Sequence, residues 1–195
     1  MIKAIIFDCF GVLTTDGWLK FLDTYLPEGG NRTKAKILNH QVDKGVIAYK
    51  DFINQVAALA DIDRQIVNDD ITEHLAKNQL LFDYIRDRIK PKYKLGILSN
   101  IAMPDWFREH FSEQELSLFD DILLSSEVGM VKPEPEIFRL SAKRLKVEPS
   151  ECVFIDDREP NIEVAKSLGM EGIFYQDFQQ MKTELEHALT PVADN

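Results

Sequence analysis

The stretch AIIFDCFGVLT, residues 4–14, decides the fold class of this chain. Its apolar run is followed by a lone carboxylate, Asp8, and soon after by Gly11. An apolar run of this kind is typical of a strand that is buried on both faces of a sheet. Ligands of open α/β sheets bind at the carboxyl ends of the strands. We therefore expect Asp8 to lie where chemistry takes place, although a single Asp after a strand is also typical of a turn or a helix cap.

The composition is that of a soluble globular protein. The chain has 195 residues, of which 45% are hydrophobic, which is enough for one core or for a core with a small second unit. Its formal net charge of −10 argues against binding to nucleic acid or to an anionic membrane surface. No apolar run approaches the roughly 20 residues of a membrane span. We expect a small-molecule substrate, which can be anionic if a metal ion dominates the charge locally.

The two cysteines, Cys9 and Cys152, fall in predicted buried strands. They form neither a disulfide framework nor a metal-binding spacing, which favours a reducing, cytoplasmic setting. Asp8 interrupts the apolar N-terminus and no small-residue cleavage site follows it, so we expect no signal peptide. Cys9 is expected to point away from Asp8 into the core, because side chains alternate along a strand.

Two regions with different periodicity follow the first strand. Residues 15–80 carry apolar positions at helical spacing and no strand pattern, which predicts a small inserted helical bundle. Beyond residue 80, strands alternate with helices, which predicts a doubly wound parallel α/β sheet. The predicted strands are 94–100, 121–125, 152–157 and 172–175, and the predicted helices are 81–89, 104–111, 135–145, 160–168 and 178–189.

Polar residues follow three of the predicted strands. They are Asp8, the pair Ser99–Asn100 and the pair Asp156–Asp157, and Lys132 in the segment GMVKPEP is a fourth candidate. Parallel strands bring these ends together, and clustered carboxylates repel one another unless a cation holds them. An all-oxygen set of ligands suits Mg²⁺. Taken singly, the polar residues are also typical of turns and helix caps, and Lys132 of a solvated loop.

In this order, Asp8, Ser99, Lys132 and the pair Asp156–Asp157 resemble the four motifs of the haloacid dehalogenase superfamily. The resemblance implies a Rossmann-like catalytic core formed by residues 1–14 and 81–195. It also implies an all-helical cap domain, residues 15–80, of the subfamily that inserts the cap after the first motif. The segment Gly45–Phe52 is similar to the substrate-facing turn of such a cap.

The resemblance also implies catalytic roles. Asp8 is expected to be the nucleophile and to form an aspartyl-phosphate, which divides hydrolysis into two easier steps. The Ser99 hydroxyl and the Asn100 backbone N–H would bind the phosphoryl oxygens. Lys132 would supply a fixed positive charge to the same group.

For the metal, the resemblance implies Mg²⁺ held by Asp8, the backbone carbonyl of Phe10, Asp156 and Asp157. The sequence departs from the family at Phe10, where phosphatases usually carry a second Asp as general acid and base. Loss of such a group typically costs about 10²–10⁴-fold in rate. Asp16 is a candidate for a replacement acid.

These residues favour a metal-dependent phosphatase that acts on a small phosphate ester, with slow or altered turnover. Three alternatives stay open: a phosphoryl-transfer or phosphoryl-holding protein, a 2-haloacid dehalogenase, which also carries an aromatic residue at the position of Phe10, and a non-catalytic binding or regulatory module. The intact Asp156–Asp157 pair argues against the dehalogenase, which needs no metal. Substrate choice is expected to depend on side chains of the cap or hinge, namely Trp18, Lys44, Tyr49 and Lys50.

Overall fold

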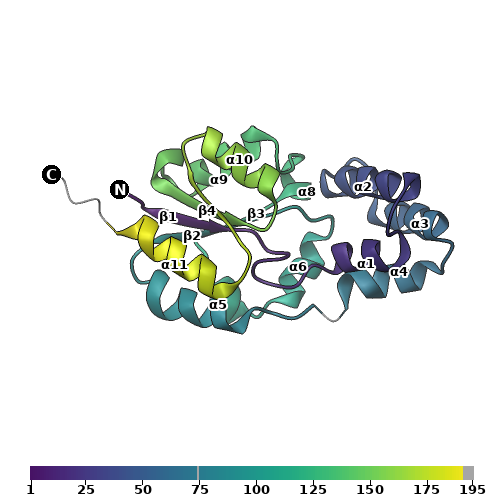
Figure 1. The fold of residues 1–195 in the computed structure, drawn as a ribbon, viewed down its shortest axis with the longest axis horizontal. Coiled ribbons are helices and arrows are strands. Elements are labelled where there is room, and N and C mark those ends of the chain that lie inside the picture. The colour runs from purple at the N-terminus through teal and green to yellow at the C-terminus, as the bar shows by residue number, and fades with distance from the viewer. Residues whose placement is uncertain (74, 191–195) are drawn as a thin grey trace.

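The computed structural model describes residues 1–73 and 75–190 of the chain. A five-stranded sheet lies at its centre, in the strand order β3-β2-β1-β4-β5, and every neighbouring pair of strands is parallel (Figure 1). The predicted doubly wound parallel sheet is therefore confirmed. The strands are β1 (Ala4–Phe7), β2 (Lys94–Ser99), β3 (Asp121–Leu124), β4 (Cys152–Asp156) and β5 (Glu171–Phe174).

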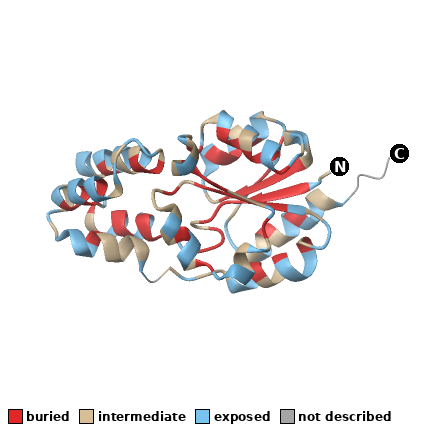
Figure 2. Ribbon diagram, turned by 180° about the vertical axis from the view of Figure 1, so that it is seen from behind, coloured by how far each residue is buried: buried red, intermediate tan, exposed pale blue. Residues whose placement is uncertain are grey.

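The central strand β1 is buried on both faces, as its apolar run predicts. All four of its residues are completely inaccessible to solvent. Ile5 and Phe7 contribute to the core on one face of the sheet, and Ala4 and Ile6 to the core on the other. Figure 2 shows the strands as the most continuously buried part of the chain. Cys9 is also fully buried in the first of these cores, as predicted.

Helices cover both faces of the sheet. The core that contains Ile5 includes side chains from α5, η1, α6 and α11, and the core that contains Ile6 includes side chains from α9 and α10. These helices are α5 (Gln79–Tyr84), the π-helical turn η1 (Ile85–Ile89), α6 (Pro104–His110), α9 (Pro135–Arg144), α10 (Glu159–Ser167) and α11 (Phe178–Leu189). Three shorter elements are α7 (Glu113–Leu116), α8 (Ser125–Val128) and the 3₁₀ turn η2 (Pro149–Glu151).

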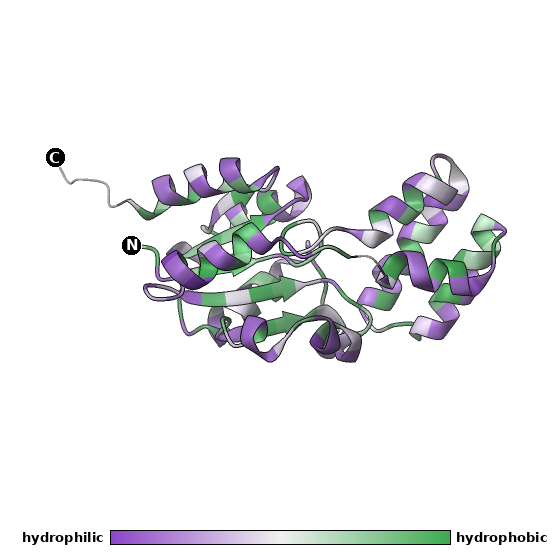
Figure 3. Cartoon of the chain, turned by 90° about the horizontal axis from the view of Figure 1, so that it is seen from below, coloured by the Kyte–Doolittle hydropathy of each residue, from purple (hydrophilic) through white to green (hydrophobic). Residues whose placement is uncertain are grey.

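Between β1 and α5, the chain forms four helices that lie at one end of the molecule, away from both termini (Figure 1). We call them the helical unit. Trp18, Phe21, Phe52 and Val56 belong to its separate apolar core, and Figure 3 shows apolar residues concentrated on the inward sides of its helices. The helices are α1 (Gly17–Tyr25), α2 (Gly30–Asp43), α3 (Tyr49–Ala60) and α4 (Arg64–Thr72).

Small differences from the predicted elements have local causes. The strand predicted to reach Ser125 ends at Leu124, because Ser125 begins α8. The helix predicted over 81–89 begins at Gln79, and its second half is π-helical, with the Lys90 N–H donating to the Ile85 carbonyl. Among the described helices, none has both the length and the apolar character that a membrane crossing requires.

Candidate active site

Three carboxylates meet at the carboxyl ends of β1 and β4. These strands are neighbours, and Phe7 is in register with Ile155. The Asp8 backbone N–H donates to the Ile155 carbonyl at 2.8 Å, which places Asp8 beside the end of β4. As a result, Asp8, Asp156 and Asp157 each present a carboxylate oxygen within 4.8 Å of the others. The predicted convergence of these three residues agrees with the structure.

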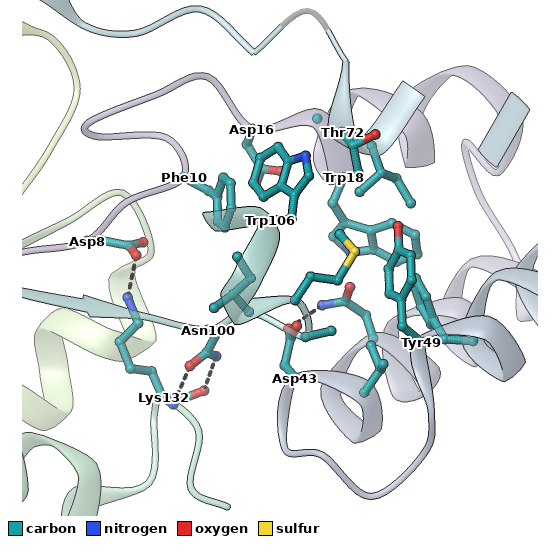
Figure 4. A pocket seen from close by; sticks show the side chains of 18 of the residues that line it. Asp8, Phe10, Asp16, Trp18, Asp43, Tyr49, Thr72, Asn100, Trp106 and Lys132 are labelled. Carbon is teal, nitrogen blue, oxygen red and sulfur yellow. Dashed lines mark hydrogen bonds and ion pairs between the residues drawn. The ribbon is translucent and has the colours of Figure 1, made fainter. Parts of the chain in front are cut away.

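Lys132 lies between two of these carboxylates. Its Nζ is 2.7 Å from Asp8 Oδ1 and 2.6 Å from Asp156 Oδ2, and the residue is only 4% exposed. Burial alone would lower the pKa of Lys132, but Asp156 and Asp8 raise it above its usual range. The buried side chain is therefore an ammonium ion at neutral pH. It is positioned by Asn100, whose side chain accepts from the Lys132 N–H at 2.8 Å and donates to the Lys132 carbonyl at 2.9 Å (Figure 4).

Asp156 is held by further donors. The Arg158 N–H donates to Asp156 Oδ1 at 2.8 Å, and Asn161 Nδ2 lies 2.9 and 3.0 Å from the two carboxylate oxygens. The first turn of α10 aims the Asn161 side chain at the Asp156 carboxylate. Hydrogen-bonded support of this kind orients a carboxylate that faces a metal.

The surroundings of Asp8 and Asp157 disfavour the ionised forms of these two carboxyl groups. Burial raises the pKa of Asp8 well above its ordinary value, against the opposing effect of Lys132. Burial and the neighbouring Asp156 raise the pKa of Asp157 to about 6. In both cases burial, the largest cause, disfavours the charged carboxylate even with Lys132 nearby. A divalent cation would offset this effect.

Two buried oxygen atoms in the same region have no hydrogen-bond partner among the described residues: Asp157 Oδ1 and Ser99 Oγ. A buried polar atom without a partner is costly, and in a site it marks a position where an ion or ligand can bind. Asp8 Oδ1 accepts from the Cys9 N–H at 2.6 Å as well as from Lys132, whereas Oδ2 accepts no hydrogen bond from the described part of the chain. The donor set of three carboxylates suits Mg²⁺.

Phe10 places an aromatic ring where the resemblance leads one to expect a second Asp. The ring stacks on Trp106 of α6, with the centroids 6.3 Å apart and the planes at 26°. Phe10 and Trp106 both line the pocket (Figure 4). Position 10 therefore contributes apolar surface to the pocket, and its side chain cannot transfer a proton.

The pocket extends from Asp8 and Lys132 to the helical unit, and Asp156 and Asp157 are not among its lining residues. Trp18 and Tyr49, two of the four side chains expected to select substrate, line it, whereas Lys44 and Lys50 do not. Lys44 forms an ion pair with Glu134, and Lys50 is exposed. Further lining residues, from both parts of the chain, are Asp8, Asp16, Asn39, Asp43, Phe52, Ile71, Thr72, Asn100, Ile101, Met103, Lys132, Arg158 and Asn161.

The sequence reasoning missed two charged residues of this pocket, Asp43 and Arg158. Arg158 Nη2 lies 3.2 Å from Asp16 Oδ2, while Asp16 Oδ1 accepts from the Leu19 N–H as the N-cap of α1. Both oxygens of Asp16 are therefore engaged. Arg158 directly follows the pair Asp156–Asp157, so its place in the sequence could have indicated that it lies at the site. Asp43 follows an ordinary helical pattern, so its sequence gives no signal.

Comparisons with known proteins agree with this geometry. Residues 2–169 match the family model described as haloacid dehalogenase-like hydrolase. The chain is 27% identical over 182 residues to a sesquiterpene phosphatase of Aspergillus oryzae, and the match covers 90% of each protein. It is 41% identical over 68 residues to bifunctional epoxide hydrolase 2 of Rattus norvegicus, but that match covers only 12% of the relative's length.

The fold is also found among solved structures. A HAD family enzyme of Bacteroides thetaiotaomicron, in complex with magnesium and inorganic phosphate, superposes with a TM-score of 0.71 at 24% identity, covering 90% of this chain and 95% of that one. The family match spans most of the chain and includes Asp8, Ser99, Lys132 and the pair Asp156–Asp157. The chain belongs to the haloacid dehalogenase-like hydrolase family.

Proposed function

We propose that this hydrolase is a Mg²⁺-dependent phosphatase that acts on a small phosphate ester. The observation that carries the proposal is the cluster of Asp8, Asp156 and Asp157, the first two of which pair with the buried Lys132. Within it and beside it, Asp157 Oδ1 and Ser99 Oγ have no hydrogen-bond partner among the described residues. Asp157 Oδ1 is suited to bind a cation, and the Ser99 hydroxyl is suited to donate to a phosphoryl oxygen. The sesquiterpene phosphatase and the magnesium- and phosphate-bound enzyme add support.

In this proposal, Asp8, the Phe10 carbonyl, Asp156 and Asp157 would hold Mg²⁺, which when bound would neutralise charge on the phosphoryl group. Ser99 Oγ and the Asn100 N–H donate to the phosphoryl oxygens.

Asp8 Oδ2 attacks phosphorus, and the bond from phosphorus to the leaving oxygen breaks. Water then hydrolyses the aspartyl-phosphate to inorganic phosphate and restores the carboxylate. Lys132 holds Asp8 Oδ1 and lowers the pKa of Asp8 against the effect of burial, which favours the ionised, nucleophilic form.

We further propose that residues 15–80 act as a cap domain over a catalytic core formed by residues 1–14 and 81–195. The helical unit supplies Trp18, Tyr49 and Phe52 to the pocket, and the core supplies Phe10 and Trp106. This lining favours an ester with an apolar or aromatic group over a sugar phosphate.

Both cysteines are buried and free, which suits a reducing cytoplasm.

The test is hydrolysis of p-nitrophenyl phosphate, whose leaving group needs little protonation. We expect turnover with Mg²⁺, loss of turnover with EDTA or in Asp8→Asn, and faster reaction than with a hexose phosphate. Asp105→Asn is the matched control, because the Asp105 side chain is 98% exposed on α6.

Other outcomes would replace the proposal. Halide release from a 2-haloacid without metal would identify a dehalogenase. Tight binding of a phosphate mimic without turnover would identify a phosphoryl-holding or regulatory module.

A further inference from the structure

Asp43 is a buried carboxyl group in the pocket to which the mechanism above gives no role. It is the last residue of α2 and is only 8% exposed. It lines the same pocket as Asp8 and Phe10 but comes from the helical unit rather than the core (Figure 4). Burial of a charged carboxylate is costly, so a buried carboxyl group that faces a reaction site is a candidate for a functional role.

Contacts with the core fix the position of Asp43. Ser125 Oγ donates to the Asp43 carbonyl at 2.5 Å and accepts from the Ile101 N–H at 2.9 Å. Ile101 follows Ser99 and Asn100. Ser125 therefore links Asp43 to the loop that would bind the phosphoryl group. Asn39 Nδ2 donates to Asp43 Oδ2 at 2.8 Å, and Oδ1 accepts no hydrogen bond from the residues that the structure describes.

The surroundings of Asp43 suit proton exchange at neutral pH. Burial raises the pKa of Asp43 to about 7, while Arg158 and Lys132 lower it and Asp16 raises it. The C-terminal end of α2 adds to the effect of burial, because the helix dipole disfavours a carboxylate there. Lys44, the next residue, is paired with Glu134 and does not neutralise Asp43. A general acid works best with a pKa near the working pH.

Resting on the proposed phosphatase function, we propose that Asp43 is the general acid and base of the reaction, in place of the carboxyl group absent at Phe10. As Asp8 attacks phosphorus, the Asp43 carboxyl gives its proton to the leaving oxygen, and the alcohol departs. The Asp43 carboxylate then takes a proton from the water that attacks the aspartyl-phosphate. Inorganic phosphate forms, and both carboxyl groups return to their starting states.

Two substrates of similar shape test this role. Benzyl phosphate releases a strongly basic alkoxide unless it is protonated, whereas p-nitrophenyl phosphate releases a stable phenolate. In Asp43→Asn we expect kcat/KM to fall about 10²–10⁴-fold for benzyl phosphate and less than about tenfold for p-nitrophenyl phosphate. Because the base for the second step is also lost, the variant should release one equivalent of p-nitrophenolate in a burst and then turn over slowly.

The controls separate this role from a structural one. Asp16→Asn removes another carboxylate from the same pocket and should lower kcat/KM for both substrates by the same factor. For benzyl phosphate, kcat/KM of the unmodified protein should decline as pH rises above about 7, since the acid must be protonated, and Asp43→Asn should lack this decline. Phe10→Asp should restore benzyl phosphate hydrolysis in the Asp43→Asn background.

An equal loss on both substrates in Asp43→Asn would overturn the role of Asp43, as would a selective loss in Asp16→Asn instead. If Asp43→Asn failed to fold, Asp43→Glu would serve, and it should keep part of the benzyl phosphate activity. Absence of p-nitrophenyl phosphate turnover in the unmodified protein would instead contradict the phosphatase function itself.

Discussion

Gly11 lies directly against the carboxylate of Asp157: a methyl group on its Cα would come within 2.1 Å of Asp157 Oδ2. Its φ of +90° is also one that side chains rarely allow. The glycine therefore lets the loop after β1 pass close beneath an acidic residue of β4's C-terminal end.

We predict that Gly11→Ala displaces Asp157 and weakens Mg²⁺ binding at least tenfold, as measured by calorimetric titration. Gly29→Ala is the matched control. Gly29 has a similar φ of +102°, but no atom lies within 4 Å of the added methyl group. Equal Mg²⁺ affinity in the two variants would show that the contact with Asp157 does not shape the metal site.

Ser99 and Ser125 are both fully buried, but their hydroxyls differ in what they bond. Ser99 Oγ has no partner within the described chain, whereas Ser125 Oγ bonds to Asp43 and Ile101. We predict that Ser99→Ala leaves the free energy of unfolding unchanged or raises it by about 1 kcal/mol, while phosphatase activity falls. In Ser125→Ala the free energy of unfolding should fall by about 1–3 kcal/mol, because the Ile101 N–H is left unpaired. Urea unfolding measures both, and a marked destabilisation in Ser99→Ala would contradict the assignment of this hydroxyl to substrate.

We expect Lys132 to stabilise the folded protein as well as to support activity. Lys132→Met leaves Asp8 and Asp156 buried without their cation. The free energy of unfolding should therefore fall by about 3–5 kcal/mol at neutral pH, and turnover should be lost. Lys90→Met removes a surface pair with Asp120, in which both side chains are at least 30% exposed, and should cost less than about 1 kcal/mol. Similar unfolding midpoints for the two variants would argue against the buried network.

The metal-free protein should lose stability as pH rises. The pKa values of Asp8, Asp43 and Asp157 are all raised by burial, the latter two to about 7 and about 6. Between pH 3.8, the ordinary pKa of these groups, and about 8, the raised pKa of Asp8, the folded state binds more protons than the unfolded state, so the free energy of unfolding falls as pH increases. Mg²⁺ would bind the ionised carboxylates of Asp8 and Asp157, and its stabilising effect should therefore grow over the same interval.

Thermal unfolding at pH 5 and pH 8, with and without Mg²⁺, measures this difference. A metal-free melting temperature that is higher at pH 8, or a Mg²⁺ effect larger at pH 5, would contradict the expected linkage.

Much of the fold could be predicted because its signals are local. The run at residues 4–7 is apolar enough to be buried on both faces, and the alternation of strands and helices after residue 80 allows few topologies. Convergence of Asp8, Ser99 and Asp156 at one edge then follows from parallel pairing. The boundary at Ser125 was missed, because whether this residue continues β3 or begins α8 depends on its contacts with Asp43 and Ile101.

The part of the site contributed by the helical unit could not be predicted in the same way. Asp43 sits in an amphipathic helix, and only the packing of α2 against α8 brings it to the pocket. Lys44 was expected to select substrate, but it forms an ion pair with Glu134, which is 90 residues away in sequence. Contacts of this separation leave no trace in local periodicity.

The most direct test of the proposed chemistry is to locate the phosphoryl group on the enzyme. The protein is mixed with p-nitrophenyl phosphate and Mg²⁺, quenched in acid within the first turnover, and digested for mass spectrometry. We predict one phosphoryl group on Asp8 that is released by hydroxylamine, is absent with EDTA or in Asp8→Asn, and accumulates in Asp43→Asn. A phosphoryl group on another residue, or undiminished turnover in Asp8→Asn, would contradict the assignment of Asp8 as the nucleophile.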